Sequence, residues 1–251
     1  MNTYKLVLIG FGNVAQGFAT IIKKHTAFIE QQYNVKCVIV AITDPKYGSF
    51  FKEDGLSIDN ILDLAKNPTN FKNIQIYKKD WNTITTIKKC NADIAIELSY
   101  SALKTGQPAF THIKESLKHG KHVITSNKGP ISLYYPELKQ LATKHNRTIG
   151  VEGTVMSGTP ALQIGANVIK GAHIKQIKGI LNGTTNYILT QMENGMSYDE
   201  ALLQAQSLGY AEANPEGDIR GYDAAGKLVI LANILMDIPL TIKDIKCTGI
   251  T

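Results

Sequence analysis

The chain has 251 residues, 43% of them hydrophobic, so it can bury one large core or two modest ones, and one or two domains are expected. Its formal charge is +6, but the basic residues are scattered without a basic stripe of interleaved aromatics, which argues against a nucleic-acid partner. Three distant cysteines (Cys37, Cys90 and Cys247) form no C-x-x-C pair, so we expect neither a disulfide scaffold nor a zinc site. No apolar stretch approaches the length of a membrane span or a signal-peptide core, and we therefore expect a cytoplasmic protein with no membrane partner.

The first part of the chain alternates short apolar runs with helical patterns. The apolar runs predict strands at residues 4–9, 36–43, 93–98 and 122–125, and the helical patterns fall at residues 13–32, 81–90 and 110–119. On the first helix, Val14, Phe18, Ile21 and Ile22 are expected to form the apolar side. Residues 44–73 are polar and turn-rich and receive no assignment. This alternation predicts an α/β fold with a Rossmann-type, doubly wound parallel sheet.

The alternation of predicted strands and helices ends at about Gly150. A Gly/Pro-rich turn is followed by a predicted helix from Ala161, a predicted strand near residues 173–180 and three helical segments up to Met236. We therefore place a domain boundary near Gly150, with a second, α+β domain at residues 151–251.

A glycine-rich motif lies at the first strand-to-helix junction. Residues 10–15 read GFGNVA and match the pattern G-x-G-x-x-G/A. Gly10 would allow a tight turn, Gly12 would let the backbone approach a pyrophosphate, and Ala15 would let the helix pack on the strand. The helix N-terminus would supply amide donors for the phosphates. The motif predicts a dinucleotide site that includes Gly10, Phe11, Gly12, Asn13 and Val14.

Asp44 stands at the end of the second predicted strand. An acidic residue at this place normally accepts hydrogen bonds from the adenine ribose hydroxyls, which favours NAD. The neighbouring Lys46 could instead bind the 2′-phosphate of NADP, and Asp44-Pro45 could also be a simple turn. The choice between NAD and NADP stays open at this point.

Asp223 and Lys227 are four residues apart on a predicted helix, so they lie on one face. An isolated pair of this kind is usually a surface ion pair of small energy. Here residues 224–232 are apolar nearly all round, apart from Lys227 itself, which is typical of a buried helix. A lysine on such a helix must be paired or functional.

Four further motifs follow in a fixed order: SNKGP at residues 126–130, EGTVMSGTP at 152–160, GILNGTTNYI at 179–188, and the acidic segment at 209–227. Together with the glycine motif, they make the whole chain resemble homoserine dehydrogenase. The last segment carries that family's signature, in which Glu, Asp, Asp and Lys stand at this spacing.

The resemblance implies an oxidoreductase that uses NAD or NADP to interconvert homoserine and aspartate 4-semialdehyde, on the way to threonine and methionine. It implies a homodimer, with an NAD(P)-binding domain at residues 1–150 and a substrate-binding and dimerisation domain at 151–251. Members of this family usually continue for several more elements beyond the position of Thr251. The substrate domain is therefore expected to be incomplete, which puts its closure and the activity in doubt.

The resemblance also implies roles for individual side chains. Lys227 would be the general acid/base, Asp223 would orient it, and Lys128 would be a second cation at the nicotinamide end. Hydride transfer to an aldehyde leaves an oxygen that needs a proton and a positive neighbour, and lysine supplies both. The amino acid end of the substrate would be bound by Glu212, Asp218 and Tyr210, under a loop that contains Gly183 and Thr184.

A monovalent cation, sodium or potassium, is also implied by the resemblance. Its ligands would be the side chain of Glu152 and the carbonyls of Val155, Ser157 and Thr159. Hard cations prefer such oxygen ligands. Residues 152–159 alone read as a Gly-rich turn before a helix, and Met156 and Ser157 replace the glycines that are usual there.

Two alternative functions remain open. The chain could be a catalytically silent NAD(P)-binding protein that keeps the site but cannot close it. It could also be another amino acid dehydrogenase, because a fold does not fix a function.

Overall fold

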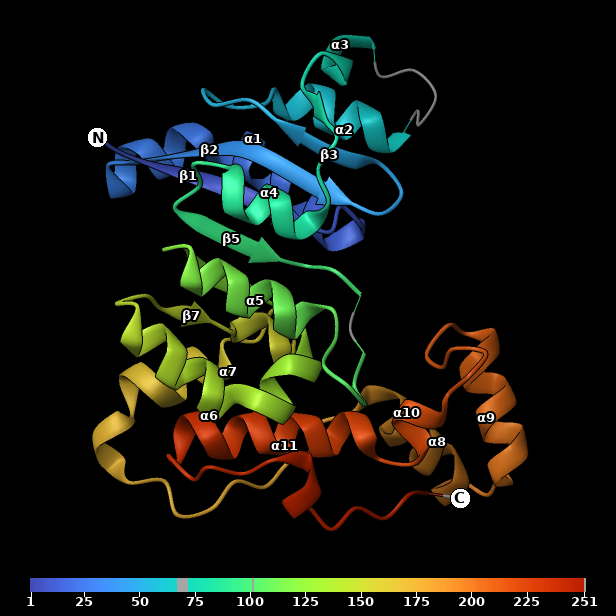
Figure 1. Cartoon of the computed structure of the whole chain (residues 1–251). Coiled ribbons are helices and arrows are strands. Elements are labelled where there is room, and N and C mark those ends of the chain that lie inside the picture. The colour runs from blue at the N-terminus through green and yellow to red at the C-terminus, as the bar shows by residue number, and fades with distance from the viewer. Residues whose placement is uncertain (67–71, 101, 251) are drawn as a thin grey trace.

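The computed structural model describes residues 1–66, 72–100 and 102–250. A seven-stranded sheet has the order β4-β3-β2-β1-β5-β6-β7 (Figure 1). The strands are β1 (Asn2–Ile9), β2 (Val35–Asp44), β3 (Gly48–Phe51), β4 (Lys78–Lys79), β5 (Ile94–Glu97), β6 (His122–Thr125) and β7 (Ile149–Gly150).

Helices cover the sheet and form the rest of the molecule. Those associated with the sheet are α1 (Asn13–Tyr33), α2 (Ile58–Lys66), α3 (Lys72–Gln75), α4 (Thr83–Lys89), α5 (Ala109–Lys118) and α6 (Lys128–Lys144). Those of the later part are α7 (Ala161–Gln163), α8 (Gly183–Glu193), α9 (Tyr198–Ser207), α10 (Glu216–Ile219) and α11 (Tyr222–Leu235). A π-helical stretch, Ile164–Val168, continues α7, and short 3-10 turns occupy Glu152–Thr154, Lys170–Ala172 and Ile242–Asp244.

The predicted parallel sheet is confirmed, with an antiparallel edge. Strand β1 pairs in parallel with β2 on one side and with β5 on the other, and β6 and β7 extend the parallel part. Strands β3 and β4 add the antiparallel edge. Both β3 and α2 lie in the segment without a sequence assignment. A strand of four residues such as β3 is too short to carry much periodic signal.

The predicted apolar side of the first helix is partly wrong. Ile22 is buried as predicted, but Val14 and Ile21 are 60% and 57% exposed, and the helix buries Ala15 and Ala19 beside Ile22. The three buried residues follow the i, i+4, i+7 spacing of a single helix face. Two alanines on that face let α1 approach the sheet closely, so the larger residues beside them turn outward.

The predicted strand near residues 173–180 is also wrong, since residues 173–182 are described and belong to no helix or strand. A strand needs a neighbour to satisfy its backbone groups, and none of the described segments pairs with this one.

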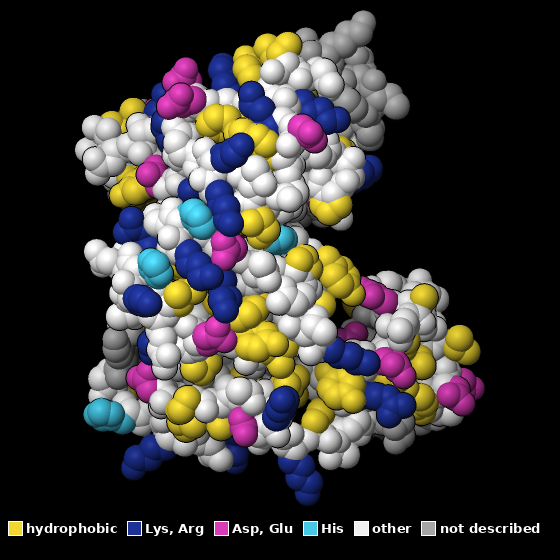
Figure 2. Space-filling view, in the orientation of Figure 1, with side chains coloured by type: hydrophobic (Ala, Val, Ile, Leu, Met, Phe, Trp, Pro, Cys, Tyr) yellow, Lys and Arg dark blue, Asp and Glu magenta, His cyan; other side chains and the backbone are white. Residues whose placement is uncertain are grey.

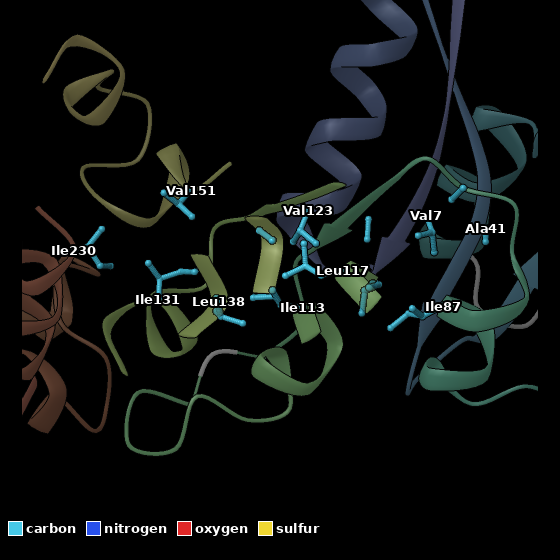
Figure 3. Close-up of a cluster of buried hydrophobic side chains, with 14 of the residues drawn as sticks. Val7, Ala41, Ile87, Ile113, Leu117, Val123, Ile131, Leu138, Val151 and Ile230 are labelled. Carbon is cyan, nitrogen blue, oxygen red and sulfur yellow. The ribbon is translucent and has the colours of Figure 1, made fainter. Parts of the chain in front are cut away.

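A continuous cluster of buried side chains joins the sheet to the later part of the chain. Figure 3 shows this cluster running from Val7 and Ala41 in the sheet, past Ile131 and Leu138 on α6, to Ile230 on α11. Helix α11 therefore packs along α6, as Figure 1 also shows. A smaller cluster between α8 and α9 contains Ile188, Ala201, Ala205 and Ala211. Since α11 shares the core of the sheet, its first turn is held against the loops at the carboxyl end of the strands.

Within the described ranges, every helix is too short or too polar to cross a lipid bilayer.

Candidate active site

The glycine loop lies where the sheet order changes direction, with β2 on one side of β1 and β5 on the other. Open α/β sheets bind ligands at this place. Gly10 has φ +87°, and a Cβ there would come within 2.6 Å of the carbonyl oxygen of Leu98. A Cβ on Gly12 would meet no atom within 4 Å, so the loop leaves open space in front of the first turn of α1. The predicted loop geometry fits a dinucleotide: Gly10 allows the turn, and Gly12 keeps room for the phosphates.

Asp44 lies beside this loop. Its Oδ2 accepts a hydrogen bond from the backbone N–H of Phe11 at 2.8 Å, and its Oδ1 accepts one from the N–H of Lys46 at 2.8 Å. Asp44 is thus both a turn residue and a carboxylate fixed next to the nucleotide loop. The ammonium of Lys46 lies 5.1 Å from the centre of the Tyr47 ring, which itself packs edge-on against Phe11.

Three charged side chains predicted from the resemblance come together between α6 and α11. Lys227 Nζ lies 2.7 Å from Asp223 Oδ2, and Lys128 Nζ lies 3.3 Å from Asp223 Oδ1. Lys227 Nζ also donates to the backbone carbonyl of Leu181 at 2.6 Å. Two lysines from different elements therefore share one carboxylate, although they are 99 residues apart, by their numbers in the sequence.

Asp223 is buried, and burial by itself raises the pKa of a carboxyl group. Hydrogen bonds from Lys227 and Asn182, together with the charges of Lys128 and Lys227, outweigh this effect and hold the pKa of Asp223 below its usual value. The carboxylate is therefore ionised at neutral pH, and it carries the negative charge that keeps both ammonium groups at this place.

Asn182 is a residue of the site that the sequence analysis did not single out. Its Nδ2 donates to Asp218 Oδ1 at 2.6 Å and to Asp223 Oδ2 at 2.9 Å, while its Oδ1 caps α8 by accepting from the N–H of Thr185. One buried carboxamide thus fixes two of the predicted carboxylates. Asn182 lies in the quoted motif at 179–188, and an asparagine before a helix is the signal that could have identified it.

The other predicted substrate residues lie at the N-terminal end of α8. Thr184 Oγ1 donates to the carbonyl of Tyr210 at 2.6 Å, and the ring of Tyr210 packs 4.8 Å from that of Tyr187. Gly183 begins the helix and is exposed. The side chain of Glu212 is exposed and its backbone carbonyl accepts from Gln206. The structure therefore links Asp218 to Asp223 through Asn182, whereas the side chain of Glu212 is exposed.

Residues 152–159, which contain the expected cation ligands, form a tight turn next to the loop that follows β6. Glu152 Oε1 accepts from the N–H of Leu162 at 3.2 Å, and the carbonyl of Thr159 accepts from the N–H of Ala161 at 2.8 Å. Met156 and Ser157 have φ of +59° and +53°, which explains why glycine is usual at these positions. One carboxylate and several carbonyls suit a hard monovalent cation. A Cβ on Gly153 would lie 3.1 Å from the side chain of Ser126, so the turn supports the segment that precedes Lys128.

A cavity of about 510 Å³ lies next to α11, lined by Leu103, Lys104 and Tyr222 among others. Tyr222 and Ala225 face it from a side of α11 other than that of Asp223 and Lys227. Figure 2 shows that the molecule is hollowed between the part with the sheet and the part formed by α8 and α9.

Comparisons with known proteins agree with this arrangement. The family model described as the NAD binding domain of homoserine dehydrogenase matches residues 10–152, and the homoserine dehydrogenase model matches residues 160–251. The chain belongs to the homoserine dehydrogenase family. The predicted resemblance is thereby confirmed.

Individual homoserine dehydrogenases match nearly the whole chain. An NAD(+)-dependent homoserine dehydrogenase of Pseudomonas canavaninivorans is 40% identical over 251 residues, which are 100% of this chain and 71% of that protein. A homoserine dehydrogenase of Methanocaldococcus jannaschii is 40% identical over 98% of this chain and 73% of its own length. A solved hyperthermophilic archaeal homoserine dehydrogenase in complex with NADPH has a TM-score of 0.81 at 29% identity, with 97% of this chain and 75% of that chain covered.

Proposed function

We propose that this chain is an NAD(P)-dependent homoserine dehydrogenase that interconverts L-homoserine and L-aspartate 4-semialdehyde. The observation that carries the proposal is the pair of lysines, Lys128 and Lys227, held on the carboxylate of Asp223. This group lies beside loops at the carboxyl edge of a sheet whose glycine loop suits a dinucleotide. Residues 1–150 would bind NAD(P), and residues 151–251 would bind the substrate and the second subunit.

Lys227 is the acid/base in this proposal. Its ammonium has three N–H donors, of which Asp223 and Leu181 account for two within the described part of the chain. The third is directed by these two contacts and donates to the oxygen of the substrate. A bound NAD(P)+ would supply the acceptor for the hydride from the alcohol carbon of homoserine. In the reducing direction Lys227 gives one ammonium proton to the aldehyde oxygen and becomes a neutral amine, and in the oxidising direction the neutral amine takes the hydroxyl proton and becomes the ammonium again.

Lys128 stabilises the negative charge that develops on the same oxygen. A second cation near this atom favours the charged transition state more than the neutral substrate, because its attraction grows with the developing charge. Asp223 keeps both lysines in place, and Asn182 holds Asp223 in turn. The residues thus orient the reacting oxygen from two sides.

Asp218 and Glu212 would bind the substrate ammonium, and Tyr210, Gly183 and Thr184 would form the surrounding wall. A desolvated ammonium needs charged acceptors. Asp218 is held by Asn182 next to the reacting group, and Glu212 is exposed at the rim. The substrate carbon chain would therefore extend from Lys227 toward Glu212.

We propose that NAD is preferred over NADP. The carboxylate of Asp44 is fixed 2.8 Å from the N–H of Phe11, at the glycine loop, where it can accept from ribose hydroxyls and would repel a 2′-phosphate. Asp44→Asn keeps the shape and removes the charge. The ratio of kcat/KM for NAD to that for NADP should fall in this variant, and an unchanged ratio would show that Asp44 does not choose the cofactor.

We propose that the turn at residues 152–159 binds sodium or potassium through Glu152 and the carbonyls of Val155, Ser157 and Thr159. The donor set supports this, because one carboxylate balances one positive charge. Replacing sodium or potassium salts by those of a bulky organic cation should lower activity in the parent protein. The same replacement should leave the activity of Glu152→Gln unchanged if the cation binds at this turn.

We also propose a homodimer. Residues 173–182 belong to no helix or strand, none of the described strands pairs with them, and Ile180 is 69% exposed. An exposed segment whose backbone has no partner strand is a surface on which a second copy can add a strand. Sedimentation equilibrium should give twice the monomer mass, and Ile180→Lys should shift the protein toward the monomer.

Turnover measured together with binding separates this proposal from its alternatives. The purified protein should bind NAD and reduce it in the presence of L-homoserine, and other amino alcohols should react more slowly. NAD binding without turnover on any amino alcohol would identify a silent binding protein. Faster turnover on a different amino acid would identify another dehydrogenase of the same fold.

A further inference from the structure

A second buried carboxylate, not considered in the mechanism above, lies at the end of β5. Glu97 is the last residue of this strand, and none of its surface is exposed. A buried glutamate is costly unless several donors satisfy it.

Donors from three segments surround Glu97. Its Oε1 accepts from the N–H of Ser99 at 3.2 Å and from the Ser99 hydroxyl, and it lies 3.3 Å from Nδ1 of His112 on α5. Its Oε2 accepts from the hydroxyl of Thr125 at 3.2 Å and from Nδ2 of Asn127. An ionised carboxylate accepts only, so this ring of donors matches it. Glu97 thus connects the loop after β5, helix α5 and the loop after β6.

Asn127 gives the strongest indication that this cluster serves the site. It is the N-cap residue of α6, a position at which asparagine usually accepts a hydrogen bond from the helix amides. Here its side chain makes no cap, and its Nδ2 instead donates to Glu97 and to the carbonyl of Ser99 at 2.9 Å. Helix α6 therefore lacks the stabilisation of a side-chain N-cap, and Asn127 connects the two loops instead.

Lys128 follows Asn127 directly. The side chain of Lys128 is 29% exposed, and its ion pair with Asp223 is 3.3 Å long. A partly exposed pair of this length does not by itself fix a long flexible side chain. The position of the ammonium therefore depends on the backbone at residues 127–128, which Glu97 holds through Asn127.

The other loop joined by Glu97 touches the nucleotide loop. The N–H of Leu98 donates to the carbonyl of Ile9 at 2.8 Å, and the carbonyl of Leu98 limits the space at Gly10. One carboxylate thus connects the backbone beside the glycine loop with the backbone that carries Lys128.

We propose that Glu97 is a positioning residue, which sets the place of the Lys128 ammonium relative to Asp223 and the glycine loop by clamping the loops after β5 and β6. This inference rests on the proposed function for the role of Lys128. The clamp itself is a property of the protein without substrate, and it can be measured separately.

The first test is the variant Glu97→Gln, with Glu137→Gln as its control. Glutamine keeps the volume but turns an NH₂ donor toward donors, whereas Glu137 is half exposed and pairs only with Lys114 among the described residues. We expect kcat with homoserine to fall roughly 10- to 100-fold in Glu97→Gln, as for a lost supporting contact or a misplacement of about 1 Å. The affinity for NAD should change little, because Gly10 is also held by its own hydrogen bond to Thr43. The control should behave like the parent.

A double-mutant cycle with Lys128→Met decides whether Glu97 acts through Lys128. If it does, Glu97→Gln should have no further effect on kcat in the Lys128→Met background. Losses that multiply in the double variant would overturn the proposal, and so would an unchanged kcat in Glu97→Gln alone. A residue that merely stabilised the fold would lower the amount of active enzyme and leave kcat per NAD-binding site unchanged.

Hydrogen exchange of the protein without substrate tests the clamp whether or not homoserine is the substrate. In Glu97→Gln, the amides of residues 98–100 and 126–129 should exchange faster together, and those of α9 should not change. If Glu97→Gln does not fold, Ser99→Ala removes one hydroxyl that donates to Glu97 and should give the same pattern to a smaller extent. Unchanged exchange in both loops would refute the clamp. A parent protein inactive on homoserine, with both loops loosened in the variant, would support the clamp and reject the proposed function instead.

Discussion

The Nζ of Lys227 lies 2.7 Å from Oδ2 of Asp223, one turn earlier on α11. The other oxygen of this carboxylate faces Lys128, from a different part of the chain. Because Asp223 is buried and ionised, it is the group that brings both cations to one place.

Lys227→Ala should lower kcat by roughly two to four orders of magnitude, as expected when a positioned acid/base is lost. The affinity for NAD, measured by nicotinamide fluorescence, should stay nearly the same. Lys227→Arg should restore little, since a guanidinium stays protonated and cannot exchange the proton. Turnover close to that of the parent in Lys227→Ala would remove Lys227 from the mechanism.

Asp223→Asn should destabilise the protein at neutral pH by roughly 1–3 kcal/mol, because hydrogen bonds to a charged group are lost. The folded protein holds the pKa of Asp223 below its usual value. The carboxylate therefore contributes stability above the unfolded-state pKa of about 3.9 and loses this contribution as the pH falls through the lower, folded pKa. Urea unfolding of both proteins at neutral and acidic pH should show the difference shrinking on the acid side. A difference that does not depend on pH would contradict the assigned ion pair.

Gly12→Val and Gly10→Ala should fail for different reasons. Gly12 has φ −78° and free space around its Cβ position, so Gly12→Val should fold normally and lose NAD binding. Gly10→Ala should lower the melting temperature, because alanine at φ +87° would lie 2.6 Å from the carbonyl oxygen of Leu98. Gly17→Val, also in open space on α1, is the control for a bulkier side chain away from the phosphates. NAD affinity at the parent level in folded Gly12→Val would mean that the phosphates bind elsewhere.

Glu212→Gln should raise the KM for homoserine and leave the affinity for NAD unchanged, because the variant loses a charged acceptor for the substrate ammonium. A four-carbon alcohol without the amino group should react equally with the parent and the variant. Glu193→Gln, an exposed carboxylate at the end of α8, serves as the control. If Glu212→Gln impairs both substrates to the same extent, Glu212 has a structural role.

Much of the sheet could be predicted because its central strands are buried on both faces and read as continuous apolar runs, as at Leu6–Ile9. The short strand β3 and the segment at 173–182, which is neither helix nor strand, could not be predicted, because their state depends on which neighbour is present. The exposure of Val14 and Ile21 depends on how closely α1 approaches the sheet. A helical pattern in the sequence carries no information about that distance.

The reacting group was predicted from the spacing of Asp223 and Lys227 and from the family resemblance. The sequence did not predict the residues that support this group, Asn182 and Glu97. Asn182 and Glu97 act through hydrogen bonds to residues 30 or more positions away, such as Asp218 and Asn127. Such contacts leave no periodic trace in the sequence, so only the folded chain reveals them.

The central claim is that this site transfers a hydride from homoserine to the nicotinamide. The most direct test is to incubate the purified protein with NAD+ and L-homoserine deuterated at its alcohol carbon, and to measure the mass of the reduced cofactor. We expect one deuterium in each NADH formed by the parent protein, and almost no NADH with Lys227→Ala. NAD binding without formation of deuterated NADH, or equal formation in the parent and the variant, would contradict the account.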